Sequence, residues 1–191
     1  MVTEQQARGF VSSAEFAAWI VAQGDAPDGV WMLIPRVGSE VVGIRYAEAL
    51  QVALAYGWID GQKRGGDDPD VWLQRFVPRR PRSRWSKVNC AHVERLIAEG
   101  RMTPRGLAEV EAARADGRWE AAYDGARAAP VPDDLSAAMD AIPGARAFFD
   151  SLRARDRYPI LYRIQAVKRP ETRARKIADY AAMLGRGEKL T

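Results

Sequence analysis

The sequence has a single cysteine, Cys90, and a single histidine, His92. One cysteine excludes a disulfide within the chain, and a protein zinc site needs about three or four ligands of the cysteine or histidine type. The chain also lacks a glycine-rich phosphate-binding loop, and its acidic cluster at residues 67–70 lacks the twelve-residue loop and closing glutamate of an EF-hand. The sequence therefore predicts no metal site and no cofactor.

Long apolar runs are lacking too. The most apolar segments, residues 16–22 and 47–59, are too short to span a bilayer and fit amphipathic helices. Residues 1–10 lack the basic and then apolar pattern of a secretory signal peptide. These absences predict that the chain has no membrane span and is cytoplasmic.

Charge is present but unevenly distributed over a chain whose net charge is +4. Residues 61–90 hold eight basic and three acidic groups, and residues 151–191 hold eleven and four. Residues 1–60 hold three basic and seven acidic groups, and residues 91–150 hold seven and eleven. Two basic zones separated by an acidic one indicate either two surfaces that face anions or segments that pair with each other.

Hydrophobic patterning predicts an α+β N-terminal portion with a small antiparallel sheet. Residues 30–37 have the pattern of a buried strand, at an edge because it contains Pro35, and residues 46–57 have that of a helix stopped by glycine. Residues 58–64 and 71–79 then resemble two strands. The turn-forming segment GGDDPD between them predicts a β-hairpin, in which Trp58 and Leu73 are expected to be mostly buried.

Two helices are predicted after the hairpin. Ser86 is suited to cap the first of them, and Thr103 the second, with Pro104 at its first position. The second helix carries more acidic than basic residues, so it would repel phosphate in the major groove and is not the reading helix of a helix-turn-helix. We therefore predict a packed helical hairpin.

A linker-like segment at residues 126–134 precedes a C-terminal portion that is predicted to be all-helical. Three prolines in it suit helix starts: Pro143, Pro159 and Pro170. The apolar face of the last helix is expected to bury Ala174, Ile177, Ala178, Ala181 and Leu184. The predicted domains are residues 1–128, which hold the sheet and the helical hairpin, and residues 129–191, which hold only helices.

Four long blocks of the chain resemble one family of bacterial proteins. They read ALAYGWIDGQKR, WLQRFVPRRPRSRWSKVN, VERLIAEGRMTPRGLAEVEAARADGRWEAAYD and FFDSLRARDRYPILYRIQAVKRPETRARKIADYAAMLGRGEKL. In order and length these blocks resemble the YdeI/OmpD-associated family, and the last one resembles its defining helical region. The family's names imply bacteriocin protection and association with an outer-membrane porin, and the resemblance implies no particular reaction, catalytic residue or cofactor.

The strongest candidate for a binding site is the basic stretch FVPRRPRSRWSKVN at residues 76–89. Arginine predominates over lysine in it, and the planar guanidinium suits bidentate contacts with phosphate or carboxylate. Pro78 and Pro81 restrict the residues before them, which predicts a stiff loop. The predicted anion-binding residues are Arg79, Arg80, Arg82, Arg84, Ser86 and Lys87. A second basic stripe is predicted on the last helix, opposite its apolar face, and consists of Arg169, Arg173 and Lys176 in line with Tyr180.

The leading functional interpretation is a non-catalytic binding protein whose basic surface meets an anionic ligand or nucleic acid. The alternative is an enzyme acting on a small anionic substrate, held by the hairpin arginines with Asp60 as general base. Asp60 more readily serves as a turn residue or pairs with an arginine of the next strand. In a third interpretation the arginines bridge to acidic groups of residues 91–150 and only stabilise the fold.

Overall fold

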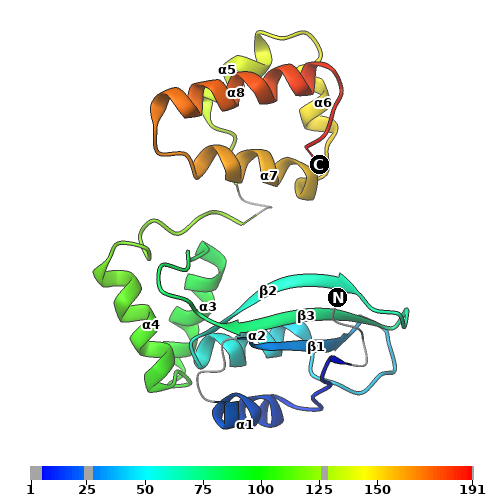
Figure 1. Cartoon of the computed structure of the whole chain (residues 1–191), viewed down its shortest axis with the longest axis vertical. Helices are drawn as coiled ribbons and strands as arrows, with labels where there is room; N and C mark the ends of the chain where they lie inside the picture. The colour runs from blue at the N-terminus through cyan, green and yellow to red at the C-terminus, as the bar shows by residue number, and fades with distance from the viewer. Residues whose placement is uncertain (1–5, 24–27, 126–128, 191) are drawn as a thin grey trace. The chain divides into compact units, whose positions relative to one another are not determined.

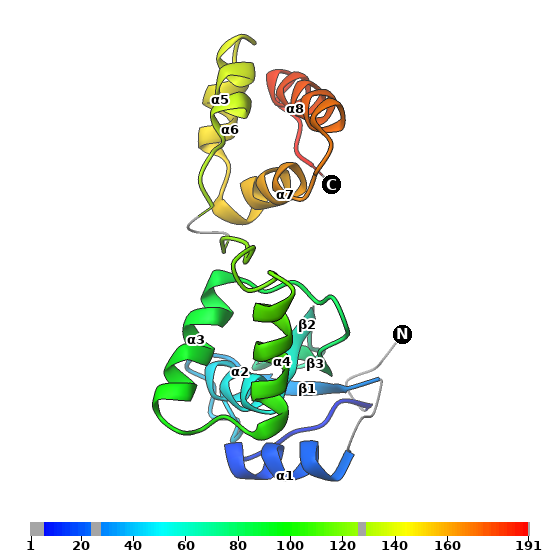
Figure 2. The same cartoon turned by 90° about the vertical axis from the view of Figure 1, so that its left-hand side faces the viewer.

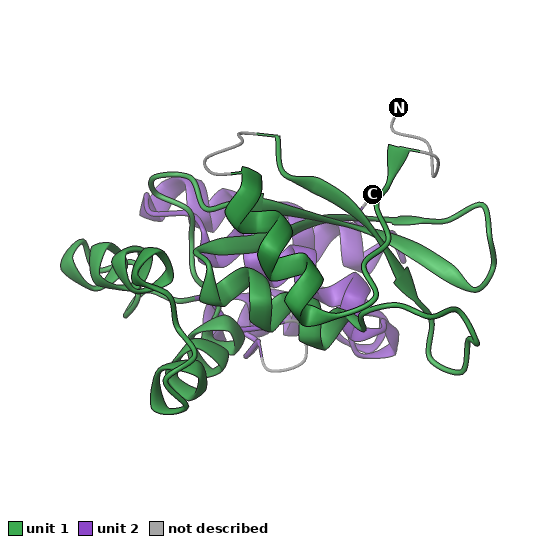
Figure 3. Ribbon diagram, turned by 90° about the horizontal axis from the view of Figure 1, so that it is seen from below, with its two compact units in different colours: residues 1–122 green, residues 123–191 purple. Residues whose placement is uncertain are grey.

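A computed structural model describes residues 6–23, 28–125 and 129–190. The chain divides into two compact units, residues 1–122 and 123–191, which are coloured separately in Figure 3. The sequence-based domain boundary after residue 128 falls at a segment, residues 126–128, that lies outside the described residues. Each unit is considered by itself below.

The first unit contains a three-stranded antiparallel sheet, as the sequence predicts (Figure 1). Its strands are β1 (Val30–Pro35), β2 (Trp58–Gly65) and β3 (Val71–Pro78), in the order β1-β3-β2. The predicted hairpin is therefore confirmed, and β1 lies at an edge. In the turn between β2 and β3, the Asp68 side chain accepts a hydrogen bond of 2.7 Å from the Asp70 amide, which is typical of an aspartate-initiated turn.

The helices of the first unit are α1 (Ser13–Gln23), α2 (Tyr46–Ala55), α3 (Lys87–Ala98) and α4 (Pro104–Ala115). Helix α2 occupies the centre, because it packs on β2 and also contacts the other three helices (Figure 2). Both predicted caps are confirmed: Ser86 accepts a hydrogen bond from the Asn89 amide, and Thr103 from the Gly106 amide. Gly106 also allows a close approach of α4 to the end of α2, where a side chain would overlap the Ala55 carbonyl.

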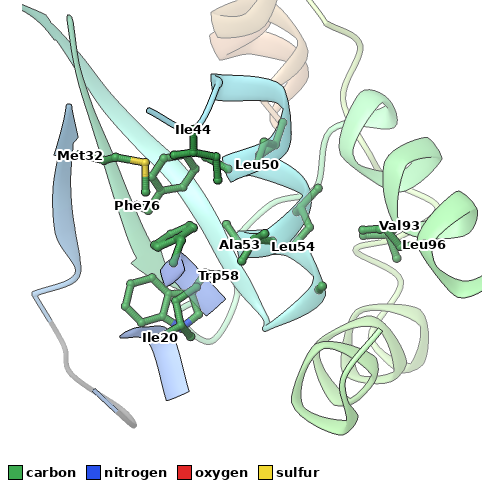
Figure 4. Close-up of a cluster of buried hydrophobic side chains, with 14 of the residues drawn as sticks. Ile20, Met32, Ile44, Leu50, Ala53, Leu54, Trp58, Phe76, Val93 and Leu96 are labelled. Carbon is green, nitrogen blue, oxygen red and sulfur yellow. The ribbon is translucent and has the colours of Figure 1, made fainter. Parts of the chain in front are cut away.

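The core of the first unit lies between the sheet and helices α1 and α2 and extends to α3 (Figure 4). Among the fully buried side chains of the sheet, Trp58 and Phe76 are the largest. Trp58 and Leu73, which the sequence predicts to be buried, are 0% and 3% exposed. Each fully buried side chain of this size contributes about 1.5–3 kcal/mol relative to an exposed one, so the hairpin is fixed to the helices mainly by this apolar contact.

In the second unit, the elements formed by the described residues are helices, as predicted, and Tyr123 adds one isolated β-bridge. Its helices are α5 (Asp133–Asp140), α6 (Ala145–Ser151), α7 (Ala154–Gln165) and α8 (Pro170–Gly185). Helix α8 packs against the other three and buries Ile177, Ala181 and Leu184 in the common core. Across the described parts of the chain, no helix is both long and apolar enough to cross a bilayer.

Three details of the C-terminal prediction are wrong. Pro159 lies inside α7 rather than at its start, and Pro143 lies before the capping residue Gly144, whereas Pro170 does begin α8. An interior proline costs a helix about 3 kcal/mol, and α7 offsets this because Ile160, Leu161 and Ile164 beyond it are buried. The third detail is the apolar face of α8, which has Tyr180 buried while Ala174 and Ala178 are exposed.

Candidate anion-binding surface

The structure separates the cations of the basic stretch into one buried arginine and a set of exposed ones. Arg79 is 6% exposed. Arg80, Arg82, Arg84 and Lys87 are all exposed, and we call these four residues the loop cations. They lie between the end of β3 and the first residue of α3, within eight positions of the chain. The sequence predicts all five cations as ligands, and only the loop cations face solvent.

Arg79 stacks on a tryptophan of the same loop. Its guanidinium carbon lies 3.4 Å from the ring centroid of Trp85, and that ring is 1% exposed. Trp85 in turn contacts Trp119, with 4.9 Å between the ring centroids. A cation that is withdrawn from water over an aromatic face is attracted by about 2 kcal/mol. The stack therefore holds the first and last residues of this stretch, Arg79 and Trp85, in the interior of the unit.

Backbone contacts hold the tip of the loop between these anchors. The Arg80 amide donates to the Ser83 side chain at 3.1 Å, and the Ser83 amide donates back to the Arg80 carbonyl at 3.0 Å. Arg82, between them, has a φ of 68°, a left-handed conformation that is uncommon for residues other than glycine. Arg118 adds a hydrogen bond of 3.0 Å to the Ser83 carbonyl. The loop tip is thus a defined turn that presents Arg80 and Arg82 outward.

Ser86 belongs to the structural part of the loop. It is 8% exposed, and its hydroxyl oxygen is occupied by the Asn89 amide at 3.1 Å. The side chain therefore caps α3. Lys87 is the first residue of that helix and so lies at the positive end of its dipole. A ligand at this surface would meet the loop cations rather than the serine.

The second predicted basic stripe does not face solvent as a unit. Arg169 is exposed, but Arg173 makes two hydrogen bonds to the Asp134 carboxylate, at 2.7 and 3.0 Å, and a third to the Ile164 carbonyl. The hydrogen bond from Arg173 holds the pKa of Asp134 below its usual range. Lys176 is half-buried, with its ammonium 5.9 Å from the centroid of the buried Tyr180 ring. Arg173 thus pairs with a carboxylate of the acidic zone, residues 91–150. The third interpretation describes internal bridges of this kind for the hairpin arginines.

Asp60 is hydrogen-bonded to a residue that the sequence did not single out. The Tyr46 hydroxyl, from α2, donates to the Asp60 carboxylate at 2.8 Å. Burial, and then the charge of Asp60, raise the pKa of Tyr46 well above its ordinary value, so the hydroxyl keeps its proton and remains a donor. Tyr46 also contacts Trp72 and lines a cavity of about 460 Å³ beside it. The hydrogen bond gives Asp60 a structural role as an acceptor that ties β2 to α2.

The two soft ligands of the chain lie on α3. Cys90 is buried and His92 is half-buried. Burial raises the pKa of the Cys90 thiol, which keeps it in the protonated form that neither attacks as a nucleophile nor ligates a metal. Within the described ranges, no group of three or more histidine, cysteine and carboxylate side chains has the arrangement of a metal site.

Comparison with known proteins gives two family matches. A family model described as a domain of unknown function (DUF8412) matches residues 8–109, and one described as "Bacteriocin-protection, YdeI or OmpD-Associated" matches residues 128–187. The first covers β1 to β3 together with the loop cations, and the second covers α5 to α8. No curated protein and no solved structure matches the chain.

Proposed function

The chain belongs to the family of unknown function whose model matches residues 8–109, and its C-terminal helices match the model of the YdeI or OmpD-associated family. From this premise we propose that it is a non-catalytic protein that binds an anionic partner. The observation that supports the proposal most directly is that the basic stretch contains one buried arginine and four exposed cations. One arginine, Arg79, is used to fix the loop, and the loop cations are exposed together beside the start of α3.

Rigidity of the loop favours binding. A side chain or loop that must be ordered on binding reduces the affinity, and each immobilised long side chain costs about 0.5–1.5 kcal/mol. Here the backbone at Arg80 and Ser83 is already held by hydrogen bonds in both directions, and Arg79 and Trp85 anchor its two sides. The backbone of the loop therefore needs little further ordering when a ligand binds.

The partner we propose is nucleic acid, contacted through its phosphates. Four clustered cations of which three are arginines suit a row of phosphates, since arginine binds phosphate oxygens in a bidentate manner. The tryptophan of the loop does not supply a stacking surface for bases, because Trp85 is 1% exposed and its ring is covered by Arg79. Binding should therefore depend on charge and be largely independent of base sequence.

The test is a titration of fluorescently labelled single-stranded and double-stranded oligonucleotides, followed by anisotropy at low salt. Arg80→Gln/Arg82→Gln keeps side-chain length and removes two loop cations. Its matched control, Arg64→Gln/Arg95→Gln, removes two exposed arginines of the same unit that lie on β2 and α3. We expect the loop variant to bind roughly tenfold or more weakly, and the control about as well as the wild type.

Two results would contradict the proposal. One is equal weakening by the loop variant and its control, which would mean that only net charge matters. The other is absence of binding by the wild-type chain.

The location that we propose is the bacterial cytoplasm, because a nucleic-acid partner is present there. Fractionation of cells that produce the untagged chain tests this location.

A further inference from the structure

The second unit contains a charged cavity that the proposed function does not use. It has a volume of about 330 Å³, and its lining residues come from the end of α6, the start of α7 and the C-terminal tail. Arg153, which caps α7, and Arg155, in its first turn, line the cavity, and Lys189 lines it from the tail. Among the described lining residues the one acidic group is Asp156, so these residues together carry a net charge of +2.

The cations of this cavity are only loosely engaged with its carboxylate. Arg155 and Lys189 lie 3.7 and 3.8 Å from the two carboxylate oxygens of Asp156. Charge-assisted hydrogen bonds are about 2.7–2.9 Å long, so neither contact is a hydrogen bond. Both cations and Arg153 are exposed at the cavity. Their N–H groups can therefore turn to a ligand without first breaking a close ion pair.

Other arginines of the same unit differ in this respect. Arg146 makes two hydrogen bonds to Asp140, at 2.8 and 2.9 Å. Arg186 makes two to Glu188, at 2.8 and 3.1 Å. Arg173 is satisfied by Asp134 in the same way, as described above. Three arginines of this unit are thus closely paired with a carboxylate, whereas the arginines of the cavity are not.

The cavity is also larger than a bare inorganic anion requires. Small-molecule sites in proteins are clefts of about 300–1,000 Å³ with apolar walls and a few placed polar groups. Here Phe148 and Leu152 supply apolar wall, and the Ser151 hydroxyl donates to the Phe148 carbonyl at 2.6 Å and so holds the turn after α6. The site therefore has room for a small organic body beside an anionic group.

We propose that this cavity binds a small organic phosphate, with its phosphate group on Arg153, Arg155 and Lys189 and its organic part against Phe148. A phosphate monoester carries a charge of about −1.5 to −2 at neutral pH, which matches the net charge of +2 in the lining. A ligand with a single carboxylate carries a charge of only −1, so it would not balance the net charge of +2 in the lining. The site is separate from the loop cations and does not depend on the function proposed for them.

The test uses the full-length chain and two-dimensional ¹H–¹⁵N NMR, with glycerol 3-phosphate, glycerate and glycerol as probes. Arg155→Gln/Lys189→Gln removes two of the three cations. The control, Arg163→Gln/Lys168→Gln, removes one exposed arginine and one exposed lysine of the same unit. Loss of two charge-assisted contacts should weaken binding by about tenfold or more.

We expect saturable shifts at the amides of residues 148–156 and 189 with glycerol 3-phosphate, weaker ones with glycerate and none with glycerol. The cavity variant should lose the binding and the control should keep it.

If the double variant melts at a lower temperature by circular dichroism, Lys189→Gln alone replaces it, since this residue lies on the tail. The proposal is overturned by equal binding of glycerate and glycerol 3-phosphate, by equal affinity of variant and wild type, or by no saturation at millimolar probe. Loss of the binding in Arg80→Gln/Arg82→Gln instead would assign it to the loop cations and also overturn the proposal.

Discussion

Replacement of Tyr46 by phenylalanine tests the link between α2 and the sheet. The change removes the hydroxyl that donates to Asp60 at 2.8 Å and keeps the ring that contacts Trp72. A hydrogen bond to a charged group contributes about 1.5–3 kcal/mol to stability. Asp60 is half-buried, so water can partly replace the lost donor, and we expect Tyr46→Phe to lower the free energy of unfolding by about 1–2 kcal/mol.

The same variant should change how stability depends on alkaline pH. Tyrosine in an unfolded chain has a pKa near 10, and the pKa of Tyr46 in the folded protein is raised above this by burial and by Asp60. The hydrogen bond therefore contributes fully below a pH of about 10, and its contribution falls as the pH rises above that value because the unfolded chain loses the proton first. The stability difference between wild type and Tyr46→Phe should consequently shrink above a pH of about 10.

Tryptophan fluorescence reports this unit selectively, because all six tryptophans of the chain lie within residues 1–122. Urea unfolding followed at neutral pH and at pH values above about 10 gives both quantities. Tyr56→Phe is the control, since Tyr56 is also half-buried and lies one residue beyond α2. An unchanged stability of Tyr46→Phe at neutral pH, or a difference that persists undiminished at alkaline pH, would refute the reasoning.

Three further variants test the packing described above. Ile177→Asp places a carboxylate in the core of the second unit and should cost several kcal/mol, whereas Ala178→Asp at the next, exposed position should change stability by less than about 0.5 kcal/mol; far-ultraviolet circular dichroism melts distinguish them. Arg173→Gln removes the pair with Asp134 and should cost about 1 kcal/mol near neutral pH. Because the pKa of Asp134 is lowered in the folded state, this cost should disappear as the pH falls below about 4, and acid-range melts that keep a constant difference would contradict it. Arg79→Lys keeps the charge and loses the planar stack, so we expect about 1 kcal/mol of destabilisation in tryptophan-monitored unfolding, and no change would show that charge alone suffices.

Local sequence signals predicted those parts of the fold that depend on neighbouring residues. Ser86 and Thr103 cap their helices because a hydroxyl can reach the amide three residues later whatever the rest of the chain does. The GGDDPD segment turns the chain for a similar reason, since the Asp68 side chain accepts a hydrogen bond from the Asp70 amide two residues later.

Features that depend on tertiary packing were not predictable in this way. Pro159 carries a local signal for a helix start, and burial of the apolar residues after it overrides that signal. On α8 the apolar pattern places Ala174 and Ala178 on the core face, but both are exposed and Tyr180 is buried. A long side chain that is apolar in its body can cover more of the core than a methyl group can.

The candidate site shows the same limit. The sequence identified the basic stretch but could not tell Arg79 from its neighbours, since all of them carry the same charge and only the position of the Trp85 ring distinguishes the buried one. Asp60 was identified without Tyr46, because the two residues lie 14 positions apart and meet only when α2 packs on β2. Neither the contact of Arg79 with Trp85 nor the hydrogen bond from Tyr46 to Asp60 can be predicted from neighbouring residues in the sequence.

The salt dependence of oligonucleotide binding tests the central claim most directly. If the four loop cations contact phosphates, the logarithm of the association constant should fall with the logarithm of the salt concentration with a slope of roughly −3. Arg80→Gln/Arg82→Gln should reduce this slope to roughly half, and Arg64→Gln/Arg95→Gln should leave it unchanged. A slope near zero, or the same slope in the loop variant as in the wild type, would show that the loop cations do not bind a polyanion.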